Sequence, residues 1–155
     1  MNLSTSFVAW FAFILCLPLM AADKKPKIVP NSPQAKAAIE KEIRFRLDKP
    51  KGALTEADLG KVTALDLNRK NISDVGDLKE LKQVKWLWLN SNQIHDISAL
   101  KELREITSLH LESNQLVDTD GLKELRQLKE LSINHNQLRD LSALKGLTQL
   151  RYLDL

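Results

Sequence analysis

The sequence predicts an α/β solenoid, in which repeats stack into a parallel concave β-sheet with short convex helical turns and an N-terminal helical cap. Aliphatic residues recur every 22 positions in one register. Apolar and variable positions alternate at the start of each unit, as in a half-buried strand. No unit is long enough to bury its own apolar face, so the units must stack. Two of the columns are Leu65, Leu87, Leu109, Leu131, Leu153 and Leu67, Leu89, Leu111, Ile133, Leu155.

Residues 1–22 are predicted to be a signal peptide. They contain no charged side chain, Phe7 to Leu17 is an unbroken apolar stretch, and Ala21 and Ala22 provide small residues for cleavage. No Lys or Arg precedes the stretch, so an uncleaved anchor is the alternative. The stretch is shorter than the roughly 20 residues of a spanning helix. We expect a mature chain with no membrane span, secreted or held in the cell envelope.

The single cysteine, Cys16, lies inside this segment. A lipidated cysteine is the alternative interpretation, but Leu15 precedes it where a small residue is usual. The mature chain then has no cysteine, which excludes disulfides, thiolate catalysis and cysteine-based metal sites. The repeat core has to hold the fold together alone.

Residues 23–33, rich in Lys and Pro, are expected to be a flexible linker, and residues 34–58 a helical cap. Ser32 is suited to cap a helix that starts at Pro33, and Thr55 with Asp58 resembles a capping box. The cap should cover the open first edge of the solenoid. Its apolar stripe is Ile39, Ile43 and Leu47.

Residues 59–155 are predicted to form the repeats, four full units and a truncated fifth. An asparagine follows the second, third and fourth predicted strands, where the first repeat has Lys70, and its amide can bond to the backbone of neighbouring turns, so this column is predicted to be a structural ladder. An aspartate column can cap the convex turns. A metal site at Asp118–Gly121 is the competing interpretation, but it lacks further carboxylates, so we expect no metal and no cofactor. The columns are Asn92, Asn114, Asn136 and Asp74, Asp96, Asp118, Asp140.

The chain has 23 basic and 20 acidic residues, all after residue 22. Lys-Glu pairs recur at one repeat position, which indicates a solvated convex face. Nucleic-acid-binding proteins concentrate positive charge on one side, and here each positive charge has a negative neighbour. We therefore expect no nucleic-acid partner. The pairs are Lys79-Glu80, Lys101-Glu102 and Lys123-Glu124.

The motif from Val84 to Leu100, with its Leu-x-Leu-x-x-Asn core, resembles the 22-residue leucine-rich repeat of bacterial internalin-like proteins. The segment Leu54 to Leu59 after the predicted helix resembles the region that precedes such repeats. The resemblance covers about residues 34–155. It implies a leucine-rich repeat fold whose concave sheet grips another protein, with a ligand that differs between members.

The outward strand positions define the predicted concave face. Three of the four aromatic residues after the predicted signal lie there, which is the sharpest functional signal in the sequence. Exposed tryptophan is the commonest hot-spot residue of interfaces. The alternative is that the indoles pack on each other or under the cap. The predicted partner-binding residues are Trp86, Trp88, Asn90, His110, Glu112 and Tyr152.

Catalysis is not predicted. No serine or cysteine nucleophile with a base partner can be placed beside His95, His110 or His135, and an open sheet excludes little water. Carbohydrate binding is the alternative function, with Trp86 and Trp88 as stacking platforms.

The chain stops at Leu155 just as a fifth strand forms, which predicts an open apolar edge. Such an edge would self-associate or mark a fragment of a longer repeat protein. The sequence as a whole predicts a secreted, non-enzymatic module for protein–protein interaction, acting in adhesion or host interaction.

Overall fold

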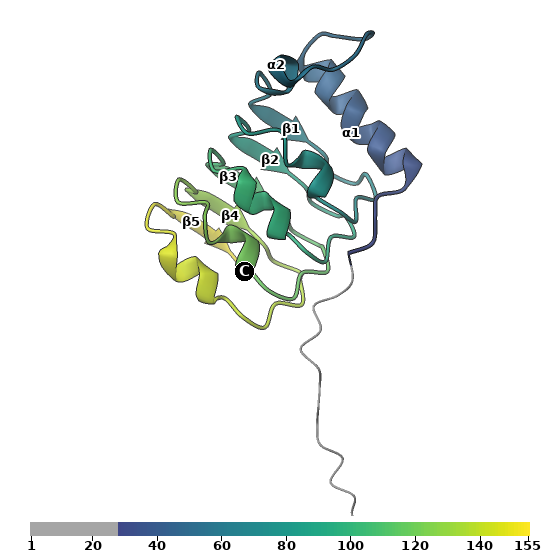
Figure 1. The fold of residues 1–155 in the computed structure, drawn as a ribbon. Helices are drawn as coiled ribbons and strands as arrows, with labels where there is room; N and C mark the ends of the chain where they lie inside the picture. The colour runs from purple at the N-terminus through teal and green to yellow at the C-terminus, as the bar shows by residue number, and fades with distance from the viewer. Residues whose placement is uncertain (1–27) are drawn as a thin grey trace, which may run out of the picture.

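The computed structural model describes residues 28–155, so the predicted signal peptide, with Cys16, lies outside the described residues. Two helices come first, α1 (Pro33–Arg46) and α2 (Glu56–Leu59). Strands and 3-10 turns then alternate (Figure 1). The strands are β1 (Ala64–Asp66), β2 (Trp86–Trp88), β3 (Ser108–His110), β4 (Glu130–Ser132) and β5 (Tyr152–Asp154). The 3-10 turns are η1 (Gly76–Leu78), η2 (Ser98–Glu102), η3 (Asp120–Leu122) and η4 (Ser142–Gly146).

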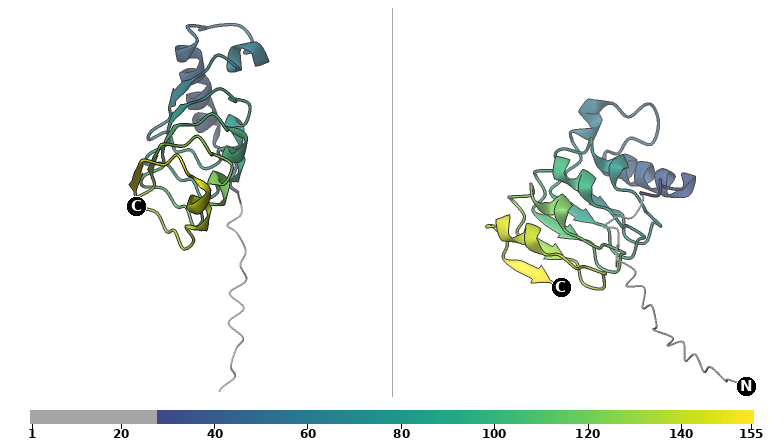
Figure 2. Two further views of the ribbon diagram at one scale, coloured as in Figure 1. Left: turned by 90° about the vertical axis from the view of Figure 1, so that its left-hand side faces the viewer. Right: turned by 60° about the horizontal axis from the view of Figure 1, so that its bottom comes forward.

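The five strands form one parallel sheet in the order of the chain, β1-β2-β3-β4-β5. Leu65 pairs with Leu87 and Leu87 with Leu109, so equivalent positions of successive repeats lie side by side. Figure 2 shows the strands on one side of the stacked coils and the 3-10 turns on the opposite side. The predicted leucine-rich repeat solenoid is therefore confirmed.

The aliphatic columns form the core. The central leucines of β1 to β4 are buried, and so are the residues that follow each strand by one position, such as Leu67 and Leu89. Each fully buried leucine contributes roughly 1.5–3 kcal/mol. Because each column continues from coil to coil, these contributions accumulate along one continuous core.

The chain turns sharply after each of the strands β1 to β4 through a residue with positive φ. Arg69 and Ser91 have φ of 56°, Ser113 of 55° and His135 of 54°, all in the left-handed region. This conformation directs the chain away from the sheet. Residues other than glycine adopt it at a cost of order 1 kcal/mol or more. The repeated cost indicates that the neighbouring hydrogen bonds hold the bend firmly.

The asparagine column supplies those bonds. The Asn92 amide donates to the carbonyls of Leu67 and Leu89 at 2.9 and 2.8 Å, and its oxygen accepts the backbone N–H of Lys70 and Ile72 at 3.0 Å. Asn114 and Asn136 repeat the pattern one and two coils later. Each amide thus satisfies backbone groups of two successive coils.

The convex aspartates act one position earlier than a helix cap. The Asp96 carboxylate accepts the backbone N–H of Ser98 at 2.6 Å, in an Asx turn, whereas Ile97 occupies the cap position of η2 and makes no capping bond. Asp74, Asp118 and Asp140 accept in the same way. The turns that they start are 3-10 helices, since each repeat leaves room for only one tight turn.

Helix α1 covers the β1 end of the sheet (Figure 1). The Ser32 hydroxyl accepts the backbone N–H of Ala35 at 3.1 Å, and Pro33 is the first helical residue, as predicted. Ile39 and Ile43 are buried against the core, and Leu47 is partly buried there. The predicted helical cap is thus present.

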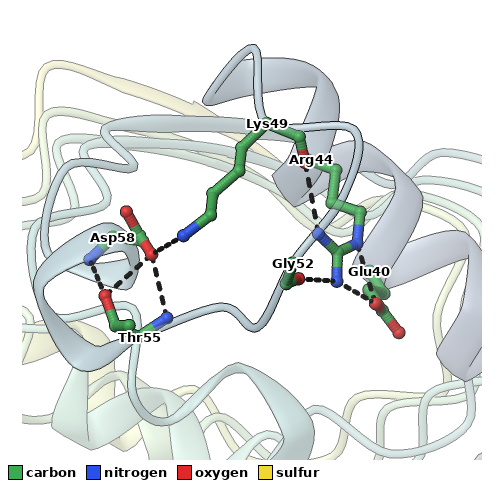
Figure 3. A network of polar contacts seen from close by, with 6 residues as sticks. All are labelled: Glu40, Arg44, Lys49, Gly52, Thr55 and Asp58. Atoms are coloured by element: carbon green, nitrogen blue, oxygen red, sulfur yellow. Dashed lines mark hydrogen bonds and ion pairs between the residues drawn. The ribbon is translucent and has the colours of Figure 1, made fainter.

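A polar network fixes the segment between α1 and α2 (Figure 3). Arg44 pairs with Glu40 and donates to the carbonyls of Lys49 and Gly52 at 3.2 and 3.0 Å. The Lys49 ammonium lies 2.6 Å from the Asp58 carboxylate. The capping box of Thr55 and Asp58 is present.

Asn31, in the segment predicted as a linker, is buried and docks on the first coil. Its side-chain oxygen accepts the backbone N–H of Ser73 and Asp74 at 2.9 and 3.0 Å, and its amide donates to the Asp74 carbonyl at 2.6 Å and the Asp77 carboxylate at 2.9 Å. The residue covers backbone groups that a preceding repeat would otherwise cover.

At the opposite end of the sheet, Leu153 is 41% and Leu155 59% exposed. Within residues 28–155, no helix has the length and apolar character needed to cross a membrane.

Candidate functional site

The outward side chains of the sheet form one continuous surface, which we call the concave face. They come from the first and last residues of each strand and from the second residue after it. Neighbouring outward residues are fixed by the register: Trp86 lies between Ala64 and Ser108, and Trp88 between Asp66 and His110. The concave face comprises Ala64, Asp66, Asn68, Trp86, Trp88, Asn90, Ser108, His110, Glu112, Glu130, Ser132, Asn134, Tyr152 and Asp154.

The two indoles differ in their surroundings. Trp86 is 43% exposed, because its neighbours Ala64 and Ser108 are too small to cover it. Trp88 is half-buried and stacks on the His110 imidazole, with 6.1 Å between ring centroids and 18° between the planes. The indoles therefore remain accessible on the concave face.

Ser108 lies at the centre of a short polar chain. Its hydroxyl oxygen is 3.1 Å from His110 Nε2 and 2.9 Å from Glu130 Oε2. A carboxylate can only accept, so the hydroxyl donates its proton to Glu130 and Nε2 must donate to the serine oxygen. This assigns the proton to Nε2 and leaves Nδ1 of neutral His110 as an acceptor.

The contacts of Ser108 show that the expectation of no serine with a base partner beside His110 was wrong. Ser108 does have both a histidine and a carboxylate within reach. It is only 4% exposed, however, and its proton already bonds to Glu130. The hydroxyl thus has the environment of a buried positioning group, which orients His110 against Trp88.

Asn90 and Glu112 occupy the outer row of the concave face. The Asn90 side-chain oxygen accepts the backbone N–H of Glu112 at 2.9 Å, and Asn68 serves Asn90 in the same way at 2.7 Å. The Asn90 side-chain oxygen is therefore already bonded to the adjacent coil. Both Asn90 and Glu112 are half-buried.

Tyr152 lies apart from the two indoles. It is 56% exposed and lies on β5, where it pairs with Glu130 of β4. Strand β5 is two strands beyond β3, which carries Ser108, and three strands beyond β2. At about 4.8 Å per strand, its backbone is roughly 14 Å from that of Trp86. The predicted residues thus form one compact group on β2 and β3, with Tyr152 as a separate aromatic group.

One exposed aromatic residue near the concave face was not among the predicted binding residues. Phe45 is 75% exposed and lines an open hollow together with Asp66 and Asn68 of the concave face. Its position off the apolar stripe of α1 was the available signal, since a phenylalanine outside that stripe has no core to enter.

Metal ligation is not indicated in the part of the chain that the structure describes. No group of three His, Cys, Asp or Glu side chains there is placed to hold an ion. The Asp118 carboxylate instead accepts the backbone N–H of Asp120, and Asp120 pairs with Lys123 at 2.8 Å.

The comparisons with known proteins agree with this geometry. A family model described as Leucine Rich repeats (2 copies) matches residues 82–124 and 126–155. An internalin (inlF) of Listeria monocytogenes superimposes on 87% of the chain with a TM-score of 0.73 and 31% sequence identity. The repeats of this chain are internalin-like leucine-rich repeats.

Other leucine-rich repeat structures are similar over shorter or more divergent regions. An internalin C2 of Listeria monocytogenes is 24% identical, with a TM-score of 0.57, over 83% of this chain and 70% of that one. A leucine-rich repeat protein of Leptospira interrogans is 26% identical, with a TM-score of 0.59, over 63% of this chain and 26% of that one. Among curated proteins, none matches the sequence.

The repeat protein described here spans 40% of the length of the inlF structure. The match therefore concerns the repeats and the cap, and it does not extend to the rest of that internalin.

Proposed function

We propose that this leucine-rich repeat protein is an exported module for protein–protein interaction, acting in adhesion or host contact, and that it holds its partner on the concave face. The observation that carries the proposal is the exposed indole of Trp86 next to the stacked Trp88–His110 pair. Solenoids of this kind offer an extended surface for partners. Export is proposed from the apolar segment of residues 1–22.

The Trp88 ring is suited to binding because it is already held in place. Trp88 is stacked on His110, and His110 is bonded to Ser108, so little side-chain entropy remains to be lost on association. Truncation of a central tryptophan at an interface costs about 2 kcal/mol or more, which weakens binding about thirtyfold.

The experiment is a selection of phage-displayed random peptides on the purified wild-type chain. Every enriched peptide is then measured against wild type, the double variant Trp86→Ala/Trp88→Ala and the control Leu141→Ala. Leu141 is 39% exposed and lies at the C-terminal edge of the solenoid, away from β2, so this variant removes a similarly exposed apolar group elsewhere. Circular dichroism and thermal unfolding of each variant check that the fold is intact.

The proposal expects peptides that bind wild type and Leu141→Ala equally and lose about thirtyfold or more on the double variant. If the enriched peptides bind all three proteins equally, the concave face is not the binding surface. If no peptide is enriched, the assignment as a protein-binding module is itself contradicted.

A further inference from the structure

We propose that the concave face recognises an arginine side chain of its protein partner, and that the guanidinium stacks on Trp88 beside the Asp66 carboxylate. This inference rests on the proposed function and deepens it by naming the chemistry of the partner.

The first observation concerns the two faces of the Trp88 ring. The His110 imidazole, on β3, covers one face at 6.1 Å and 18°. The opposite face of a planar ring points the other way, toward β1, where the register places Asp66. Asp66 is exposed, and Ala64, the other outward residue of β1, has a small side chain.

The second observation concerns charge. The outward positions of the sheet carry carboxylates but neither lysine nor arginine, although the whole chain has a net charge of +3. Lysine and arginine stand just before the strands, at Lys85, Lys129 and Arg151. Arg69 and Lys70 follow β1, so basic residues flank the sheet at both ends of its strands, whereas the outward positions of the strands are acidic. The carboxylates are those of Asp66, Glu112, Glu130 and Asp154.

These carboxylates lack cationic partners in the described part of the chain, whereas others have them. Glu42 pairs with Arg46 at 2.8 Å and Glu102 with Lys82 at 3.5 Å. Asp66 accepts only the backbone N–H of Asn68 at 3.1 Å, although Arg46 and Lys70 line the same hollow. Arg46 is engaged by Glu42, and neither Arg46 nor Lys70 forms an ion pair with Asp66 in the described part of the chain, so the Asp66 carboxylate remains available to a cation from outside.

The third observation concerns hydrogen bonding. Neutral His110 presents Nδ1 as an acceptor, because Nε2 donates to Ser108. The centre of the concave face thus offers π faces, carboxylates and an acceptor nitrogen. A guanidinium suits this set better than an ammonium does, because it is planar, stacks on indole and donates several N–H bonds in one plane.

The experiment uses fluorescein-labelled glycine-serine peptides that carry several arginines, several lysines or several glutamates. Fluorescence anisotropy measures their binding to the full chain and to its variants Trp88→Ala, Asp66→Asn and Glu124→Gln. Glu124→Gln makes the same change of charge as Asp66→Asn at an exposed convex position. Binding of the arginine peptide should weaken about tenfold in Trp88→Ala and in Asp66→Asn, and should be unchanged in Glu124→Gln.

Equal binding of the lysine and arginine peptides would overturn the assignment to guanidinium, and so would arginine binding that ignores both Trp88→Ala and Asp66→Asn. The phage selection separates this inference from the proposed function. Enriched peptides that depend on Trp86 and Trp88 but contain no arginine would leave the binding module in place and remove the arginine site.

Discussion

The imidazole of His110 is stacked on the indole of Trp88, with 6.1 Å between the centroids. The two residues lie at the same position of adjacent strands, and Ser108 fixes the imidazole by a 3.1 Å contact with Nε2. One face of Trp88 is therefore covered by the protein itself, while Trp86 on the same strand has only small neighbours.

We predict that acrylamide quenches Trp86 more strongly than Trp88. Each indole is observed alone in a Trp10→Phe background that also carries Trp88→Phe or Trp86→Phe. The variant that retains Trp86 should have the larger Stern–Volmer constant and the more red-shifted emission, because Trp86 is 43% exposed. The opposite order would show that the stack does not shield Trp88 in solution.

The hydrogen bond between Ser108 and His110 predicts a protected imidazole proton. In wild type the His110 Nε2–H should be visible by NMR as a hydrogen-bonded proton correlated with its imidazole nitrogen, since it donates to Ser108. In Ser108→Ala this resonance should be lost through exchange with solvent. His135, which is exposed, serves as the internal control and should give the same imidazole signals in both proteins. An unchanged Nε2–H signal in Ser108→Ala would contradict the proposed proton arrangement.

The repeat register explains why so much of the fold was predictable from the sequence. A column such as Leu65, Leu87 and Leu109 fixes the strand pairing, because a slip by one residue would turn every leucine outward. The same register predicts from the sequence alone that Trp88 lies beside His110 and Asp66, and the strand pairing agrees. Because the motif is repeated, the role of each position can be read from the residues that occupy it in several repeats.

Residues outside the register were harder to predict. Ser108 occupies a variable position, and its role depends on Glu130 of the next coil, so no column reveals it. Asn31 belongs to a polar segment with little to bury, and its buried position follows from the carbonyl and N–H groups left open at the first coil. Such contacts depend on where single side chains meet the backbone, which composition and period do not specify.

The asparagine ladder can be tested by Asn92→Ala. The substitution removes an amide that is 8% exposed and leaves the N–H of Ile72 and the carbonyl of Leu67 without their partner. A buried unsatisfied group costs about 1–3 kcal/mol, so the free energy of unfolding should fall by about 3 kcal/mol. Urea denaturation followed by circular dichroism measures this change. The neighbouring Gln93→Ala, at an exposed position, should alter it by less than about 0.5 kcal/mol.

The network between α1 and α2 predicts a pH dependence of stability. The hydrogen bond from the Lys49 side chain, and then those from the Thr55 N–H and hydroxyl, hold the pKa of Asp58 well below its usual 3.8. A carboxyl whose pKa is lower in the folded state contributes stability above the unfolded-state pKa, and the contribution is lost as the pH falls below it. The stability difference between wild type and Asp58→Asn should therefore be largest near neutral pH and shrink in acid.

Urea denaturation of both proteins across the acidic range gives this difference directly. Glu124→Gln, which removes an exposed convex carboxylate, controls for the general change of charge. A wild type to Asp58→Asn difference that stays constant from neutral pH to acid would mean that the ionised Asp58 contributes nothing to stability.

The convex side makes a prediction with its own control, because two glycines lie in equivalent 3-10 turns. A Cβ added at Gly121 would overlap the carbonyl oxygen of Ile97 on the preceding coil, whereas one added at Gly146 would meet nothing within 4 Å. Gly121→Ala must separate η2 from η3, and overpacking of this kind costs about 1–3 kcal/mol. Gly146→Ala should be neutral or slightly stabilising, since alanine restricts the unfolded chain. Thermal unfolding of the two variants should thus give a clearly lower Tm for Gly121→Ala alone, and equal Tm values would show that the two coils are not in close contact at Gly121.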